Sequence, residues 1–124
     1  MKELVLIFIG SGIGGLTRYS LGKWINSLHD HHFPFGTLLV NVLACFGVGI
    51  LIGLADNKQI LSVSLRLFLV VGFCGGFSTF STFSSETLTL FQQGHNTSLV
   101  LYVLASILIC VTATFTGLLI ADRI

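Results

Sequence analysis

The stretch Gly72–Glu86, which reads GFCGGFSTFSTFSSE, offers ligands for ions without placing a positive charge among them. A glycine pair is followed by phenylalanines spaced three residues apart, with serines and threonines between them. Where a helix is interrupted its last carbonyl oxygens lose their partners, and a small hard cation prefers such oxygen ligands. Hydroxyl groups and the electropositive edges of aromatic rings can instead face an anion. The composition of this stretch therefore favours an ion or substrate site.

The residues around this stretch place it inside a membrane. Nineteen uncharged residues separate Arg66 from Glu86, and at ~1.5 Å per residue they cover roughly the hydrocarbon core of a bilayer. We therefore predict that residues 60–91 form two half-helices with a break at 75–78, near the membrane midplane. Broken helices at that depth usually line an ion or substrate site. Gly75 and Ser78 bracket the predicted break and are the expected backbone ligands for a small cation.

The rest of the chain indicates an all-α membrane protein. Of its 124 residues, 53% are hydrophobic and 9% are charged, and the mean hydropathy of +0.95 argues against a soluble domain. The length predicts a single membrane domain, residues 1–124, with four spans at about residues 4–25, 35–55, 60–91 and 97–121. A net charge of +1 gives no electrostatic footprint for nucleic acid. Because four thin helices enclose a pore poorly, we expect an oligomer.

Phe80 and Phe83 lie three residues apart and therefore share one face of the second half-helix, with Ser81 and Thr82 between them. One interpretation is an aromatic core stripe whose neighbouring hydroxyls bond to their own helix. The other is an anion path lined by ring edges and hydroxyls, since a full positive charge at low dielectric would hold the anion too tightly. Glu86 would repel an anion, so we expect it to be structural.

Polar side chains in the other spans are further candidates for such a path. Asn41 is the one strongly polar residue of the second span, and its amide either joins helices or donates to an anion. In the last span Tyr102 lies one turn before Ser106, and hydroxyl-bearing residues continue through Thr114. These hydroxyls either bond to their own backbone or replace water around an anion. The sequence does not show which face they occupy.

Weaker motifs are assigned to packing or solvent. The GxGxxG spacing in residues 10–15 lacks the βαβ unit of a nucleotide site, so we interpret it as close helix packing. The first loop carries three histidines beside Asp30, but their spacing lacks a rigid face or a distant fourth ligand, which favours a solvated loop over a metal site. The three cysteines fall in three different spans, which argues against a disulfide framework. Arg18 is either an interfacial anchor or part of a watery vestibule.

Three motifs resemble those of the Fluc family of small fluoride channels, also called CrcB proteins. They are GGLTRY at 14–19, GTLLVN at 36–41 and GFCGGFSTFSTFSSE at 72–86, and the likeness extends over essentially the whole chain. The resemblance implies a channel and not an enzyme. Its expected activity is the passive and selective export of fluoride across a bacterial inner membrane, which lowers cytoplasmic fluoride.

The resemblance also implies an assembly and a set of site residues. Two subunits are expected to insert antiparallel into membrane lipid as a dual-topology homodimer with two fluoride pathways, and the small charge bias between the predicted loops is compatible with this. A central sodium ion is expected on the backbone carbonyls of Gly75 and Ser78, where the family often has threonine at the second position. Asn41, Phe80 and Phe83 match pore-lining positions. The remaining expected pathway residues are Ser81, Thr82, Tyr102, Ser106 and Thr114.

Two other classes of membrane protein share part of this pattern. A small multidrug exporter has the same size and number of spans, but it needs an acidic residue within the membrane, and the first span has none beyond Glu3 at its start. A membrane adaptor that transports nothing would use the glycines and hydroxyls only for packing. Fluoride efflux from liposomes would separate the three classes.

Overall fold

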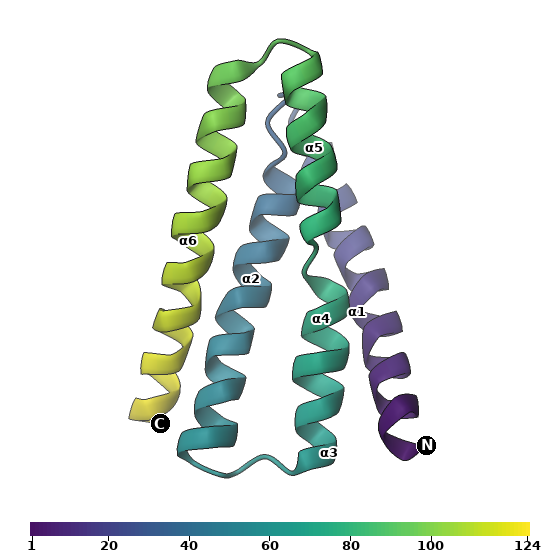
Figure 1. Cartoon of the computed structure of the whole chain (residues 1–124), viewed down its shortest axis with the longest axis vertical. Helices are drawn as coiled ribbons and strands as arrows, with labels where there is room; N and C mark the ends of the chain where they lie inside the picture. Colours follow the sequence, from purple (N-terminus) through teal and green to yellow (C-terminus); the bar gives the residue numbers. More distant parts are fainter.

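The computed structural model describes every residue from Met1 to Ile124, and it is all-helical (Figure 1). Four of its helical segments are long and apolar enough to cross a membrane, which confirms the predicted four-span, all-α fold. They cover Lys2–Ser27, Phe35–Asn57, Val63–Gln92 and Asn96–Arg123. The individual elements are α1 (Lys2–Ser27), α2 (Phe35–Ile52), η1 (Gly53–Asn57), α3 (Val63–Arg66), η2 (Leu67–Cys74), α4 (Gly75–Phe77), α5 (Phe80–Gln92) and α6 (Asn96–Arg123), of which η1 and η2 are π-helical.

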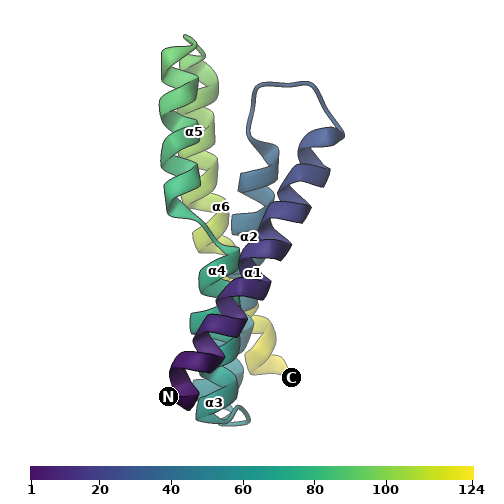
Figure 2. The ribbon, with the colours of Figure 1, turned by 90° about the vertical axis from the view of Figure 1, so that its right-hand side faces the viewer.

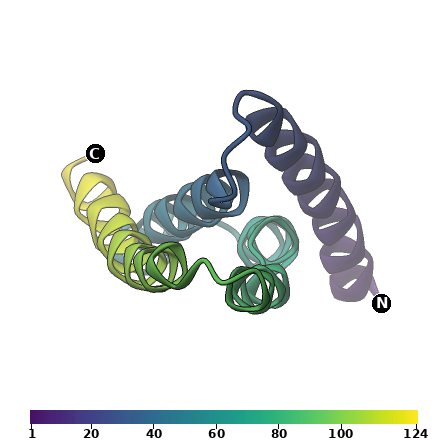
Figure 3. The same cartoon turned by 90° about the horizontal axis from the view of Figure 1, so that it is seen from above.

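The helices stand roughly side by side, and both chain termini lie at the same end of the bundle (Figure 1). Seen from above, α2 and the third segment lie between α6 on one side and α1 on the other (Figure 3). At the opposite end the backbones of α5 and α6 separate from those of α1 and α2 (Figure 2), and side chains of the loop between α1 and α2 reach across to α6, where His32 stacks on His95. Only 17 of the 124 residues are buried, so most of the apolar surface must be covered by lipid or by another chain.

Glycines let the helices approach closely at two contacts. Gly14 and Gly76 lie where α1 meets the third segment, and a methyl group at Gly76 would collide with the backbone of Ser11. Gly49 and Gly117 lie between α2 and α6, where added methyl groups would collide with main-chain carbonyl oxygens of the facing helix. Small residues that admit a facing backbone are typical of membrane helix pairs. The glycine-rich first span is thus a continuous packed helix.

The third segment has two extended residues, and they are not the glycines that we expected to divide it. Gly75 and Gly76 are helical, whereas Ser78 (φ −78°, ψ 155°) and Thr79 (φ −151°, ψ 116°) separate α4 from α5. The predicted break at 75–78 therefore overlaps the extended residues at Ser78, but its first three residues are helical and the extended backbone continues one residue further, to Thr79. The physical reason is that Gly76 is required for contact with α1, while the backbone of Thr79 obtains its hydrogen bonds from the side chain of Asn41.

Candidate functional site

Asn41 of α2 holds the backbone of Thr79 through both halves of its amide. The Thr79 N–H donates to Asn41 Oδ1 at 2.9 Å, and Asn41 Nδ2 donates to the Thr79 carbonyl at 3.2 Å. Neither backbone group of Thr79 makes a backbone hydrogen bond. The Thr79 hydroxyl in turn accepts the Thr82 N–H at 3.1 Å, so Thr79 is the N-cap of α5. Asn41 therefore fixes the place where α5 begins.

Backbone carbonyls are left without partners just before this point. The Ser78 N–H and hydroxyl both donate to Cys74, at 2.9 Å each, and the Gly76 carbonyl accepts Arg18 Nε at 3.4 Å. The carbonyls of Gly75 and Ser78 receive no hydrogen bond. Gly75 is exposed and Ser78 is half-buried. These two oxygens are the type of ligand that a hard cation prefers.

A cavity of about 260 Å³ lies beside Thr79, between α2, α5 and α6. Its wall includes the buried Ser106, whose hydroxyl oxygen has no hydrogen-bond partner. The rings of Phe80 and Phe83 lie 5.5 Å apart at 43°, and Phe80 is 80% exposed. The full lining is Asn41, Cys45, Ser78, Thr79, Phe80, Phe83, Ser106, Ile107 and Cys110. The cavity thus combines neutral hydrogen-bond donors with aromatic rings and contains no charged residue.

Glu86 joins three helices beside this cavity. Its carboxylate accepts the hydroxyl of Thr37 from α2 at 2.7 Å and the hydroxyl of Tyr102 from α6 at 2.9 Å. Tyr102 is completely buried, and its ring lies 5.1 Å from that of Phe83. Because both carboxylate oxygens receive donors, Glu86 stabilises the packing of α5 against α2 and α6.

A second cavity, of about 400 Å³, lies between α1, α2 and α5. Arg18 and Lys23 line it from α1, and Thr82 and Glu86 line it from α5. Thr79 lines both this cavity and the one that contains Phe80. Since Arg18 also donates to the Gly76 carbonyl, the structure places it at a polar cavity between helices, which agrees with the vestibule interpretation more closely than with an isolated surface anchor.

The structure brings together four of the eight expected pathway residues, namely Asn41, Phe80, Phe83 and Ser106. The other four lie elsewhere. Ser81 is exposed with its hydroxyl 3.4 Å from that of Thr79, and Thr82 faces the second cavity. The Tyr102 hydroxyl donates to Glu86, and the Thr114 hydroxyl donates to the Cys110 carbonyl of its own helix at 3.1 Å.

Sequence reasoning missed two polar residues of this region. Thr37 is a partner of Glu86, and nothing in the sequence marks that pairing because the two residues are far apart in the chain. Thr79 did leave a signal, since a threonine preceding a helix by one position is a typical N-cap, and Thr79 caps the amide three residues later.

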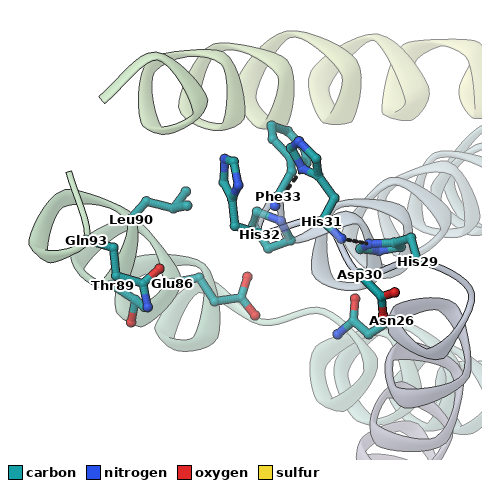
Figure 4. A pocket seen from close by; sticks show the side chains of 11 residues that line it. Asn26, His29, Asp30, His31, His32, Phe33, Glu86, Thr89, Leu90 and Gln93 are labelled. Atoms are coloured by element: carbon teal, nitrogen blue, oxygen red, sulfur yellow. Dashed lines mark hydrogen bonds between the residues drawn. The ribbon is translucent and has the colours of Figure 1, made fainter. Parts of the chain in front are cut away.

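The histidines of the first loop surround a third cavity, of about 300 Å³, which Figure 4 shows from close by. Glu86 and Asn26 line the same space. The structure groups no three His, Cys, Asp or Glu side chains in an arrangement that would hold a metal ion. The loop histidines instead contact one another and the backbone.

Comparison with known proteins decides the family. The model of the family described as CrcB-like protein, Camphor Resistance (CrcB), matches residues 5–118. The chain belongs to the CrcB family. It is 42% identical to a fluoride-specific ion channel FluC of Rhizobium etli over 97% of this chain and 96% of that protein. It is likewise 42% identical to a FluC of Pyrococcus abyssi over 99% and 98% of the two chains, and 39% identical to one of Azobacteroides pseudotrichonymphae over 98% of each.

Membership of the CrcB family settles the broad class of this protein. It is a transporter and not an enzyme, as the sequence predicted. It is also a multi-pass integral membrane protein, which agrees with the expected location in a bacterial inner membrane.

Proposed function

We propose that this CrcB protein is a fluoride-specific channel through which fluoride leaves the cytoplasm passively. The observation that carries the proposal is the cavity that gathers Asn41, Phe80, Phe83 and Ser106 without any charged residue. The FluC proteins that it resembles over nearly their whole length are named as fluoride-specific ion channels. The chemistry of the cavity and the names of the relatives thus support the same activity.

The chemistry of the cavity suits a small anion that must enter and leave quickly. Fluoride gives up a strong hydration shell, so donors must replace the water as it passes. Ser106 has an unused hydroxyl, and the Asn41 amide keeps one N–H after it binds Thr79. The edges of Phe80 and Phe83 add partial positive charge. Because none of these groups is ionised, the anion is stabilised without being trapped.

We further propose that two copies assemble antiparallel and enclose a sodium ion. This chain leaves both Gly75 and Phe80 uncovered, and Phe80 is 80% exposed. The unpaired carbonyls of Gly75 and Ser78 fit a hard cation, since each offers a neutral oxygen and needs no carboxylate. In a twofold assembly both copies would contribute these oxygens. The ion would supply a fixed positive charge that holds the two chains together.

The test is fluoride efflux from liposomes that contain the purified protein. We expect fluoride to leave faster than from empty liposomes, and chloride to be retained. The variant Phe80→Ile should reduce the efflux rate at least tenfold, because it keeps most of the volume and removes the ring edge. Phe8→Ile is the matched control, since Phe8 lies on α1 and is also 80% exposed.

Each alternative predicts a different result from the same preparation. Equal efflux from the Phe80 and Phe8 variants would remove Phe80 from the pathway. Folded protein that releases no fluoride would favour the adaptor, and drug uptake driven by protons would favour the exporter.

A further inference from the structure

We propose that the loop between α1 and α2 is a proton-sensitive latch, which neutral histidines hold closed and which protonation releases. The latch consists of His29, His31 and His32 in that loop and His95 at the start of α6. The inference goes beyond conduction, because it depends on loop contacts that exist whether or not the chain carries fluoride.

Two hydrogen bonds inside the loop require unprotonated imidazoles. His29 Nδ1 accepts the His31 N–H at 3.2 Å, and His31 Nδ1 accepts the Phe33 N–H at 3.1 Å (Figure 4). An imidazole nitrogen accepts a hydrogen bond only while it carries no proton. Protonation of either histidine therefore replaces an acceptor by a second donor, and the backbone N–H loses its partner.

A stack of three imidazoles joins the loop to α6. The rings of His32 and His95 lie 3.7 Å apart at 7°, and those of His31 and His32 lie 4.2 Å apart at 28°. His32 Nε2 also lies 2.6 Å from the Ser98 hydroxyl in the first turn of α6. Desolvation, together with the neighbouring His95 and His31, lowers the pKa of His32. Protonation of two stacked rings would place like charges in contact at a helix N-terminus, which already carries partial positive charge.

The carboxylates around the loop do not offset this repulsion, because none of them forms an ion pair with a histidine. Asp30 lies within the loop, Glu86 faces the cavity from α5, and α1 contributes only the uncharged Asn26. No histidine forms an ion pair with either carboxylate, since the one ion pair of the structure joins Arg66 to Asp56. Glu86 is already occupied by two hydroxyl donors.

The direction of the pH effect follows from the acceptor roles of His29 and His31, which a proton abolishes, and the lowered pKa of His32 acts in the same direction. A base that is harder to protonate in the folded arrangement stabilises that arrangement fully above its ordinary pKa, near 6.5 for imidazole. The stabilisation is lost as the pH falls below this value. The latch should therefore be closed near neutral pH and should open in acid.

Opening of the loop would uncover the first turns of α6, where Tyr102 donates to Glu86 of α5. The Phe33 ring packs edge-on against Tyr102 at 5.5 Å, and the His29 ring packs edge-on against Phe35 at 5.0 Å. Protonation of His31 removes the hydrogen bond of the Phe33 N–H, so that Phe33 is left with its carbonyl bond to the Phe35 N–H and its ring contacts. Tyr102 is completely buried beneath it and donates to Glu86, so the loop covers a polar network between three helices.

Amide hydrogen exchange of the loop at pH 7.5 and 5.5, in the purified full-length protein, tests the proposal without requiring fluoride transport. The triple variant His29→Asn/His31→Asn/His32→Asn is the matched control, because an asparagine oxygen accepts the N–H two residues later but does not titrate, and because no loop ring is left to carry a charge beside His95. The ratio of wild-type to control exchange at each pH cancels the intrinsic effect of pH on exchange. We expect a ratio near one at pH 7.5 and about tenfold faster exchange of the wild type at pH 5.5, which corresponds to the loss of a hydrogen bond worth about 1.4 kcal/mol from the closed loop.

A second variant checks the opened state. His29→Ala/His31→Ala lacks both acceptors and should exchange rapidly at both pH values. If the wild type keeps the exchange rate of the asparagine variant at pH 5.5, the latch does not exist, whatever the fluoride efflux assay gives. A protein that opens in acid but releases no fluoride would leave the latch standing and overturn the proposed function alone.

Discussion

Replacement of Asn41 by leucine should destabilise the protein by far more than an ordinary hydrogen bond between membrane helices. Leucine has a similar size, but it leaves both the N–H and the carbonyl of Thr79 without a partner. An unpaired buried backbone group costs about 1–3 kcal/mol, so the two together amount to about 2–6 kcal/mol. The lower figure already changes the ratio of folded to unfolded protein by about 30-fold.

The comparison value is what side-chain hydrogen bonds between membrane helices usually contribute, about 0.6 kcal/mol each. That value is small because the partners released by mutation find other groups. Thr79 has an extended backbone and lies between α4 and α5, so no carbonyl or amide of either helix is placed to form the hydrogen bonds that Asn41 makes. The loss of unfolding free energy caused by Asn41→Leu should therefore exceed the roughly 1.2 kcal/mol expected for two ordinary hydrogen bonds.

Reversible unfolding in mixed detergent micelles measures the difference. Thr112→Val is the control, because the Thr112 hydroxyl bonds only to its own helix, at 2.7 Å from Leu108. A second variant, Asn41→Asp, keeps an acceptor for the Thr79 N–H but places a carboxylate oxygen against the Thr79 carbonyl, so it should also lose stability, and its negative charge should stop fluoride efflux. A loss below about 1.2 kcal/mol for Asn41→Leu would refute the idea that this side chain fixes the start of α5.

Two further predictions address packing and the Glu86 network. Gly117→Ala should destabilise the protein by about 1–3 kcal/mol, because the added methyl meets the Phe46 carbonyl, whereas Gly12→Ala faces open space and should stabilise α1 by up to about 1 kcal/mol. Thermal unfolding that moves in the same direction for both variants would contradict the close contact of α2 and α6. Tyr102→Phe removes one donor from Glu86 and should cost about 1.5–3 kcal/mol of stability while fluoride efflux changes little. A collapse of efflux at unchanged stability would instead place Tyr102 in the pathway.

The third segment shows how far sequence reasoning reaches in this protein. Composition and the uncharged run before Glu86 were enough to predict a membrane span, since length and hydropathy are properties of the chain itself. The position of its extended residues was not predictable in the same way. A glycine pair permits a break, but it equally permits a close contact, and here Gly76 serves contact with Ser11 of α1. Only the facing helix decides between the two uses.

The last span illustrates a second limit. Its sequence is apolar on all sides, so no periodic pattern indicates which hydroxyls face a neighbour. In the structure Ser106 is buried at a cavity, whereas Thr112, Thr114 and Thr116 each donate to a carbonyl four residues earlier. Threonine and serine have both options in a membrane helix, and the choice depends on helix packing that acts over long separations in sequence.

Whether a polar group has a hydrogen-bond partner within the chain distinguishes structural groups from candidate ion ligands better than its residue type does. Inside a membrane each polar group needs a partner, because lipid supplies none. Glu86 has two donors and Thr79 has Asn41, so these groups are explained by packing alone. The hydroxyl of Ser106 and the carbonyls of Gly75 and Ser78 have no partner in the chain. Those unpaired groups are where an anion and a cation would lower the free energy most, and they coincide with the proposed fluoride path and sodium site.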